Sequence, residues 1–450
     1  MIDDLLAARL QMAISLGFHI LFAVAGMAMP LLTVLAEWRF YRGHGTVYRD
    51  LAHRWAKGTA ILFAVGAISG TVLSFELGLL WPRFMAQAGP LIGMPFSLEG
   101  LAFFLEAIAL GIYLYGWNRV SPRMHLASGV VVAISGAASG VLVIAVNAFM
   151  NTPRGFVLDD QGNVAAVNLW EVFFSPAFPV QAFHMLTAAY ASVGFAVLGI
   201  HAARLLRTPA DPFHRAALRL VLPLLIVIMP LQLLSGDFSA KHLAVYQPAK
   251  LAAAESLWET QTGAPFLVGG IPLDGGERVI LGIHIPQLLS FLAHGDFDAK
   301  VIGLKDFPPE HRPPVAIPHF AFQLMVGCGT LMLALSAWAA YGLLRKRALE
   351  EDRRFLRAAL LTAPLGLIAV EAGWMVTEVG RQPWIIQGVM LVKDAVTPMP
   401  GLQYSLFASV LVYLLLGSVV AVLLYREVLS TQPLRASSPV HAAPERQPAE

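Results

Sequence analysis

The feature that most constrains this chain is a series of long apolar runs, each long enough to cross a lipid bilayer. About 20 apolar residues span the hydrocarbon core as a helix, and nine such runs occur in the sequence. Hydrophobic residues make up 57% of the chain and charged residues 13%, which is too few charges for a water-soluble surface. We therefore predict an all-α integral membrane protein with nine transmembrane helices. They are expected at roughly 11–36, 58–80, 96–117, 127–150, 184–204, 217–236, 316–344, 358–379 and 403–425.

The distribution of lysine and arginine predicts how the helices are oriented. These residues are concentrated after the first, third, fifth and seventh predicted helices, most densely in "RKRALEEDRRFLR", whereas the connection after the second helix carries only Arg83. Because basic connections stay in the cytoplasm, we expect the N-terminus outside and the C-terminus in the cytoplasm. The acidic start "MIDDLLAARL" and the length of the first run argue against a cleavable signal peptide. The polar segment 429–450 is predicted to be a disordered cytoplasmic tail.

One connection is far longer than a helix-to-helix turn requires. We expect transmembrane helices one to six over 1–236, an extracytoplasmic loop over 237–315 and helices seven to nine over 316–428. Within the loop, "KLAAAESLWETQ" places Lys250 and Glu255 on neighbouring helical turns. These charges mark either a solvated amphipathic helix or a docking site where Lys250 and Glu255 bind and deprotonate a polar headgroup.

Several ionisable side chains lie inside the predicted helices, where each costs about 3 kcal/mol or more and usually marks function. Since odd-numbered helices run inward and even-numbered helices run outward, one group shares the outer layer of the membrane. This group consists of His19, Glu99, His184, Met325 and Glu378. Glu106 follows Glu99 on the same helix face, about 10 Å deeper at 1.5 Å per residue.

Histidine and methionine are haem ligands, and small residues one turn away would let a porphyrin approach the helices. Such neighbours are Ala23 beside His19, Ala188 beside His184 and Ala321 beside Met325. The single cysteine, Cys328, and the lack of a C-x-x-C-H motif mean that any haem is bound non-covalently. Taken singly, a membrane histidine or methionine is more often a packing residue, but the group at one depth favours haem.

Two polar residues of the fourth predicted helix have two interpretations. Ser139 and Asn147 lie on nearby turns of "GAASGVLVIAVNAFM", where they either line a proton path or accompany close helix packing through the G-x-x-x-G match. An ion-coupled membrane transporter with a buried Glu/His proton relay is the alternative function. A transporter needs a midplane site with broken helices, whereas these polar groups gather in the outer layer.

Seven blocks of sequence resemble, in order, subunit I of the cytochrome bd quinol oxidases. The resemblance extends to about residue 425, and G-W-x-x-x-E-x-G-R-Q-P-W is its most specific signature. The blocks are "GFHILFA", "FSLEGLAFFLEAIALGIYLYGW", "NAFMNTPRGF", "FHMLTAAY", "KLAAAESLWETQ", "FQLMVG" and "GWMVTEVGRQPW".

The resemblance implies a set of cofactors and their ligands. It implies His184 and Met325 as axial ligands of a low-spin haem b, with His19 and Glu378 as ligands of two high-spin haems. One high-spin haem is a haem b, and the other is a haem d or a haem b in its place. Trp374 could pack on a porphyrin, and Arg381 suits haem propionates or an ordinary interfacial position.

The resemblance also implies the roles of other site residues. Glu99 is expected at the haem d and proton-gate region, and Lys250 with Glu255 in the quinol site. The expected path for cytoplasmic protons contains Glu106, Ser139 and Asn147. The implied activity is a quinol:oxygen oxidoreductase that oxidises quinol at the outer face and reduces O2 to water. It would generate a proton motive force by charge separation, without a proton pump.

The implied setting is the bacterial inner membrane and its lipid. The expected partners are a subunit II, quinol and O2, with a small single-helix accessory subunit as a further candidate and no nucleic acid. Two features depart from the pattern. Gln323 stands where many relatives have arginine, and the loop resembles the short variety, which includes cyanide-insensitive oxidases. The haem that reduces O2, the quinone, cyanide sensitivity and the oligomeric state stay open.

Overall fold

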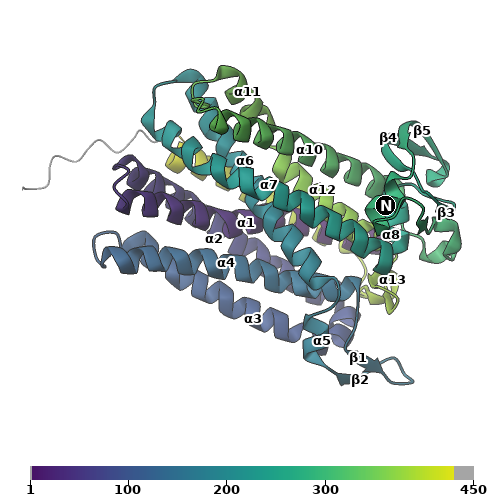
Figure 1. Ribbon diagram of the computed structural model, residues 1–450. Helices are drawn as coiled ribbons and strands as arrows, with labels where there is room; N and C mark the ends of the chain where they lie inside the picture. Colours follow the sequence, from purple (N-terminus) through teal and green to yellow (C-terminus); the bar gives the residue numbers. More distant parts are fainter. Residues whose placement is uncertain (1–2, 430–450) are drawn as a thin grey trace, which may run out of the picture.

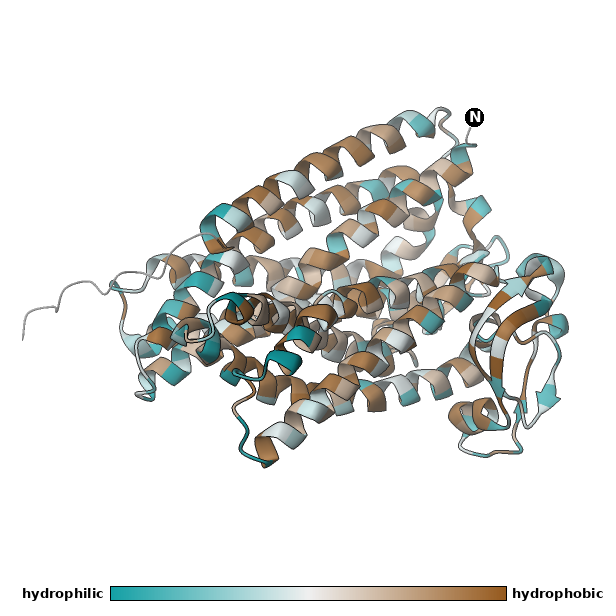
Figure 2. Ribbon diagram, turned by 90° about the horizontal axis from the view of Figure 1, so that it is seen from above, coloured by the Kyte–Doolittle hydropathy of each residue, from teal (hydrophilic) through white to brown (hydrophobic). Residues whose placement is uncertain are grey.

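Nine helices long and apolar enough to cross a membrane are present in residues 3–429, the part of the chain that the computed structural model describes (Figure 1). Apolar residues dominate along the helices, and hydrophilic residues gather toward their ends (Figure 2). The prediction of an all-α membrane protein is confirmed. The helices are α1 (Asp4–Tyr41), α2 (Val47–Leu80), α3 (Pro82–Tyr115), α4 (Pro122–Asn151), α6 (Phe178–Arg207), α7 (Pro212–Tyr246), α10 (Ala316–Leu344), α11 and α12 (Arg353–Thr362 and Leu365–Val379), and α14 (Leu402–Leu424) with a π-helical turn (Tyr425–Leu429). The predicted tail lies outside the described residues, apart from Leu429.

Several helices extend beyond the apolar runs that predicted them. α3 begins at Pro82 rather than near 96, and α7 continues to Tyr246, so that the long connection starts at 247 rather than 237. Hydropathy marks only the segment suited to hydrocarbon, whereas a helix continues until a residue interrupts it. At Pro364 the structure instead interrupts a helix that the sequence predicted to be continuous. This proline divides the predicted single helix into α11 and α12, because proline lacks a backbone N–H and clashes with the preceding turn.

Contacts between helix ends establish an up-and-down bundle. At one end, Asp4 Oδ1 accepts hydrogen bonds from the backbone N–H groups of Gly401 and Leu402, at 3.0 and 2.8 Å. At the opposite end, Arg204 donates to the carbonyl of Leu429 at 2.7 Å. We call the first the loop end, because it carries residues 247–315, and the second the arginine-rich end. In Figure 1, α8 and the strands β3, β4 and β5 lie at one end of the bundle, the loop end.

The long connection folds into a small unit on the loop end. It contains α8 (Pro248–Ala254), β3 (Gln261–Thr262), β4 (Phe266–Leu273), β5 (Arg278–Ile285), α9 (Leu288–His294), β6 (Lys300–Val301) and three 3-10 turns (Asp274–Gly276, Leu304–Asp306 and Pro309–His311). β4 and β5 form an antiparallel hairpin in which Phe266 faces Ile285, and β3 pairs with β6. Leu251, Ala264 and Leu289 belong to its own buried apolar cluster. The connection is therefore a packed unit rather than an extended strap.

Two further connections add short elements. Between α4 and α6 lie β1 (Phe156–Leu158), β2 (Val164–Val167) and α5 (Leu169–Phe173), and between α12 and α14 lie β7 (Trp384–Ile386), β8 (Met390–Leu391) and α13 (Val392–Ala395). The backbone N–H of Gln387 donates to the carbonyl of Met150 at 3.0 Å. This contact brings the segment after α12 against the end of α4.

The buried core centres on α1, α6 and α7, with Leu32, Phe195 and Leu225 among its fully buried side chains. α6 and the α11–α12 segment pack closely against each other at two glycines. A Cβ added at Gly199 would collide with Ala363, and one at Gly366 would collide with Ser192. Small residues allow such close packing in membrane bundles. The packing fixes α12 beside α6, the two helices that carry Glu378 and His184.

Candidate functional site

Glu378, at the loop end of α12, is held by side chains from two directions. Arg381 makes an ion pair with its Oε2 atom, and Asn147 Nδ2 of α4 donates to its Oε1 atom at 2.5 Å. A carboxylate oxygen has two lone pairs, so each oxygen can still accept a further partner. Asn147, which the sequence predicts to line the proton path, thus contacts the predicted iron ligand.

Hydrogen bonds continue from Asn147 to the long connection. Asn151 Nδ2 donates to Asn147 Oδ1 at 2.9 Å, and Lys250 Nζ donates to Asn151 Oδ1 at 2.5 Å. Gln247 Nε2 also donates to Asn151 Oδ1, at 3.0 Å. A line of side chains therefore joins Lys250 to Glu378. The sequence interpretation missed Asn151, although Asn147 and Asn151 are spaced four apart in "NAFMN", which places both on one helix face.

Lys250 lines a cavity of about 260 Å³ at the loop end. Other lining residues are Gln247, His311, Arg381, Gln382 and Trp384. Since an apolar cavity of about 150 Å³ holds benzene, this one has room for a single substituted ring. Lys250 is 3% exposed, and burial followed by the charge of Arg381 lowers its pKa to about 7, against the opposing effect of Glu378.

Glu255 lies apart from this cavity, beneath the β4–β5 hairpin. Its Oε2 atom accepts a hydrogen bond from the backbone N–H of Leu267 at 3.1 Å, and its Oε1 atom has no partner among the described residues. Glu255 is 4% exposed, and burial raises its pKa to about 8. Because both charged side chains are buried, the interpretation of this segment as a solvated amphipathic helix is wrong. The structure does not, however, place Lys250 and Glu255 in one cavity.

His19 and His184, on α1 and α6, share one hydrogen-bonding arrangement. His19 Nδ1 lies 3.0 Å from Ser69 Oγ, which donates to the Val65 carbonyl at 2.9 Å. His184 Nδ1 lies 2.9 Å from Ser235 Oγ, which donates to the Gln232 carbonyl at 2.8 Å. Because each serine donates its only proton to a carbonyl, each Nδ1 carries the imidazole hydrogen. Nε2 is then the acceptor nitrogen of each ring, as a metal-ligating histidine requires, and in His184 it lies 3.3 Å from the side-chain amide Nε2 of Gln232.

Glycines lie directly against these ligand candidates. A Cβ at Gly70 would lie 3.0 Å from the imidazole of His19, and one at Gly373 would lie 3.1 Å from Met325 Sδ. A Cβ at Gly236 would reach the ring of His184 at 3.9 Å. Met325 is on α10 and His184 is on α6, and both helices pack against α7 and α12. The structure thus places the two candidates in one group of four helices.

Buried donors beside α12 suit an acidic group. Arg381 is 3% exposed, yet its Nε and Nη1 atoms have no hydrogen-bond partner within residues 3–429, and neither has Trp374 Nε1. A buried donor without an acceptor is costly, and haem propionates would satisfy the guanidinium. Together with two imidazoles, a thioether and a carboxylate, these observations fit haem groups bound without covalent attachment.

Glu99 and Glu106 of α3 have different surroundings. Ser139 Oγ donates to Glu99 Oε1 at 2.8 Å. Glu106 is buried, and its Oε1 atom has no partner in the described part of the chain. A Cβ at Gly136 would lie 3.0 Å from that atom and 2.9 Å from the Gly26 carbonyl. The three predicted path residues therefore separate: Ser139 contacts Glu99, Asn147 contacts Glu378, and Glu106 faces Gly136.

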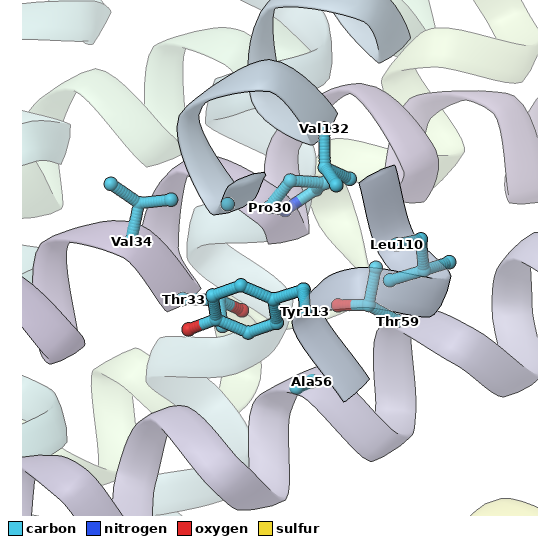
Figure 3. Close-up of a pocket in the computed structure, with 9 residues that line it drawn as sticks. Pro30, Thr33, Val34, Ala56, Thr59, Leu110, Tyr113 and Val132 are labelled. Atoms are coloured by element: carbon cyan, nitrogen blue, oxygen red, sulfur yellow. The ribbon is translucent and has the colours of Figure 1, made fainter. Parts of the chain in front are cut away.

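A cavity of about 10 Å³ lies on the arginine-rich side of Glu106, between α1, α2, α3 and α4 (Figure 3). This is about the smallest cavity that can hold one water molecule. Thr33 and Thr59 donate to carbonyls of their own helices, Met29 and Trp55, both at 2.9 Å. The exposed lining is apolar, so this cavity provides space rather than a hydrogen-bonded line for protons.

The sequence interpretation missed several other ionisable residues that are buried or half-buried in the bundle. Glu76 accepts a hydrogen bond from Gln11 at 2.9 Å, and Glu371 lies against Gly17. Glu37 contacts His125 at 2.6 Å near the arginine-rich end. Their position within or beside apolar runs was the available signal, by the same criterion that singled out Glu106.

Comparisons with known proteins identify the family of this chain. The family model for cytochrome bd terminal oxidase subunit I matches residues 7–432. A Bacillus subtilis relative, named provisionally as a cytochrome bd menaquinol oxidase subunit I, is 38% identical over 431 residues, covering 94% of this chain and 96% of its own. Cytochrome bd ubiquinol oxidase subunit 1 of the same organism is 30% identical, with 95% and 94% covered.

A solved structure is also similar throughout. The bd oxidase from Geobacillus thermodenitrificans matches with a TM-score of 0.90 and 37% identity, covering 96% of this chain and 99% of that chain. These matches exclude the transporter alternative and place the chain in the bacterial cytoplasmic membrane as a multi-pass protein of respiratory electron transport. This chain therefore belongs to the cytochrome bd terminal oxidase subunit I family.

Proposed function

We propose that this chain is the catalytic subunit of a terminal quinol oxidase that oxidises quinol at the loop end and reduces O2 to water. The observation that carries the proposal is the hydrogen-bonded line from Lys250 to Glu378. It joins a cavity large enough for a quinol ring to a candidate iron ligand inside the bilayer. By the positive-inside rule the arginine-rich end faces the cytoplasm and the loop end faces outward.

The proposed haem ligands are residues whose surroundings prepare them for iron. His184 and Met325 hold a low-spin haem b, while His19 and Glu378 each hold a high-spin haem, one a haem b and the other a haem d or a haem b in its place. Bound haem supplies one-electron transfer and an iron centre for oxygen. The chain supplies the Nε2 atoms of the two histidines, and Arg381 supplies donors for propionates.

Quinol oxidation releases two protons, and the chain offers two groups for them at the loop end. Lys250 binds the headgroup in the cavity, and with a pKa of about 7 it can give up and take up a proton near neutral pH. Glu255 is the second group, with a pKa of about 8. Because both lie at the outward end, these protons leave on the outer side.

Oxygen reduction consumes protons, which come from the arginine-rich end. Glu106 passes them toward Glu99, which Ser139 orients by its hydrogen bond of 2.8 Å. Proton movement from the cytoplasm to this outer layer separates charge and builds a proton motive force without a pump. A subunit II, with or without a small accessory subunit, completes the surroundings of the haems in the complex.

The test of this function is quinol-dependent O2 uptake by the complex purified from its native membranes. Ubiquinol and menaquinol are compared, because one relative is named for each. The proposal expects uptake with at least one of them, at the expense of quinol and with water as the product. A complex with haem that consumes O2 with neither quinol would overturn it.

Replacing Lys250 with methionine is expected to raise the KM for quinol roughly 10- to 100-fold, since a hydrogen bond to a charged group contributes about 1.5–3 kcal/mol. In the native protein the KM should increase as the pH rises through about 7, where Lys250 loses its charge. In K250M the KM should be independent of pH over this range. Steady-state O2 uptake at several pH values measures both effects.

The matched control is Lys241→Met, because Lys241 lies on α7 and pairs with Asp237 at the surface. It should leave the KM and its pH dependence as in the native complex. If K250M binds quinol with the native KM, Lys250 does not contact the headgroup.

A further inference from the structure

Two side chains on one face of α10 hydrogen-bond the backbone of the long connection. His319 Nδ1 lies 2.9 Å from the Ala254 carbonyl of α8, and His319 Nε2 lies 3.2 Å from the Gly269 carbonyl of β4. One helical turn later, Gln323 Nε2 donates to the Leu267 carbonyl at 2.7 Å, and Gln323 Oε1 accepts from the Gly269 N–H at 2.8 Å. His319 is fully buried. α10 therefore holds both α8 and β4.

Gln323 suits this position because its amide both donates and accepts. Leu267 and Gly269 are two apart in β4, and the carbonyl of the first and the N–H of the second both face Gln323. The side-chain amide pairs with them as a neighbouring strand would. Arginine has five donors and no acceptor, so an arginine here would leave the Gly269 N–H without a partner. The glutamine at position 323, where the sequence departs from the arginine of many relatives, therefore bonds β4 in a way that arginine cannot.

The strand that Gln323 holds also covers Glu255. The N–H of Leu267 donates to Glu255 Oε2 at 3.1 Å, so Leu267 is bonded through its N–H to the residue that follows α8 and through its carbonyl to α10. While this strand stays in place, Glu255 is sealed from solvent and from the Lys250 cavity. Quinol therefore reaches Lys250 directly, but it reaches Glu255 only when β4 moves.

We propose that His319 and Gln323 are positioning residues of the quinol site, which clamp β4 over Glu255 and so control the access of quinol to this carboxyl. The proposal rests on the proposed function, in which Glu255 takes part in quinol oxidation. The clamp itself is a property of the folded chain and can be measured without quinol. This separation makes the two claims testable independently.

The experiment measures amide hydrogen exchange of β4 and quinol kinetics in the purified complex of the Gln323→Leu variant. Leucine keeps most of the volume but can neither donate nor accept, so exchange at Leu267 and Gly269 should accelerate about tenfold. The KM for quinol should change at least threefold, with kcat at saturating quinol and the haem spectrum kept within twofold of native.

Gln323→Glu keeps the acceptor for Gly269 and should leave exchange at that amide near native. Gln161→Leu, in the exposed turn between β1 and β2, is the matched control and should change neither quantity.

Native exchange rates in Q323L would overturn the clamp. Faster exchange with an unchanged KM would overturn its role in the quinol site. Glu255→Gln, measured alongside, separates this result from a failure of the proposed function. If E255Q oxidises quinol with native kinetics, Glu255 has no part in the reaction, and the assignment of a quinol role to the clamp falls with it. Altered kinetics in E255Q with a native KM in Q323L would count against the clamp alone.

Discussion

Replacing Met325 with leucine is expected to remove the low-spin haem band and to reduce quinol-driven O2 uptake to below about one hundredth of native, since even indirect support of a metal ligand is worth 10- to 100-fold. Leucine lacks the thioether that ligates iron, but its similar volume makes the exchange mild for folding, at less than about 1.5 kcal/mol. The reduced-minus-oxidised spectrum measures the loss. Absorption from the high-spin haems should persist.

Met332→Leu is the control for this experiment, because Met332 is buried on the same helix and belongs to the apolar core. It should keep all haem bands and native activity. A native spectrum in M325L would refute the ligand assignment for Met325. Loss of every haem band at once would show that the substitution disrupted the fold rather than one site.

Replacing Glu106 with glutamine should slow O2 reduction roughly 100-fold, the lower range of what a positioned proton-transfer group contributes. Glutamine has nearly the same shape but cannot carry a proton, while Glu106 has no described hydrogen-bond partner at Oε1 whose loss would disturb packing. Quinol should still reduce the low-spin haem at the native rate under anaerobic conditions. Stopped-flow spectroscopy separates these two phases.

The same substitution at Glu76 serves as the control, since Glu76 is also buried in a transmembrane helix but bonds Gln11. E76Q should keep both phases near native. Native O2 reduction in E106Q with full haem content would show that protons take another route. Slow electron entry in E106Q would place its effect at the haems instead.

The sequence alone predicted much of this fold, because hydropathy reports directly which segments can lie in a bilayer. The predicted helix bounds were wrong where a helix continues beyond its apolar run, as α7 does to Tyr246, or where a proline interrupts it, as at Pro364. The sequence identified His19, His184, Met325 and Glu378 as candidates, since ionisable or soft ligands in apolar runs are conspicuous. Their roles as ligands stay predictions that the spectra above would test.

Pairing between helices could not be predicted from the sequence. Asn147 was expected in a proton path, but the ends of α4 and α12 meet, and it contacts Glu378. Lys250 and Glu255 were expected in one site, but α8 directs them to different neighbours, Asn151 and Leu267. These contacts depend on how separate elements pack, which composition and spacing along one element do not contain.

The most direct test of the central claim is the optical spectrum of the purified complex during anaerobic addition of quinol and then O2. We expect haem bands that quinol reduces and O2 reoxidises. The amount of haem should be three groups per copy of this chain, one for the pair His184 and Met325, one for His19 and one for Glu378. A complex without haem, or with haem bands that quinol cannot reduce, would contradict it.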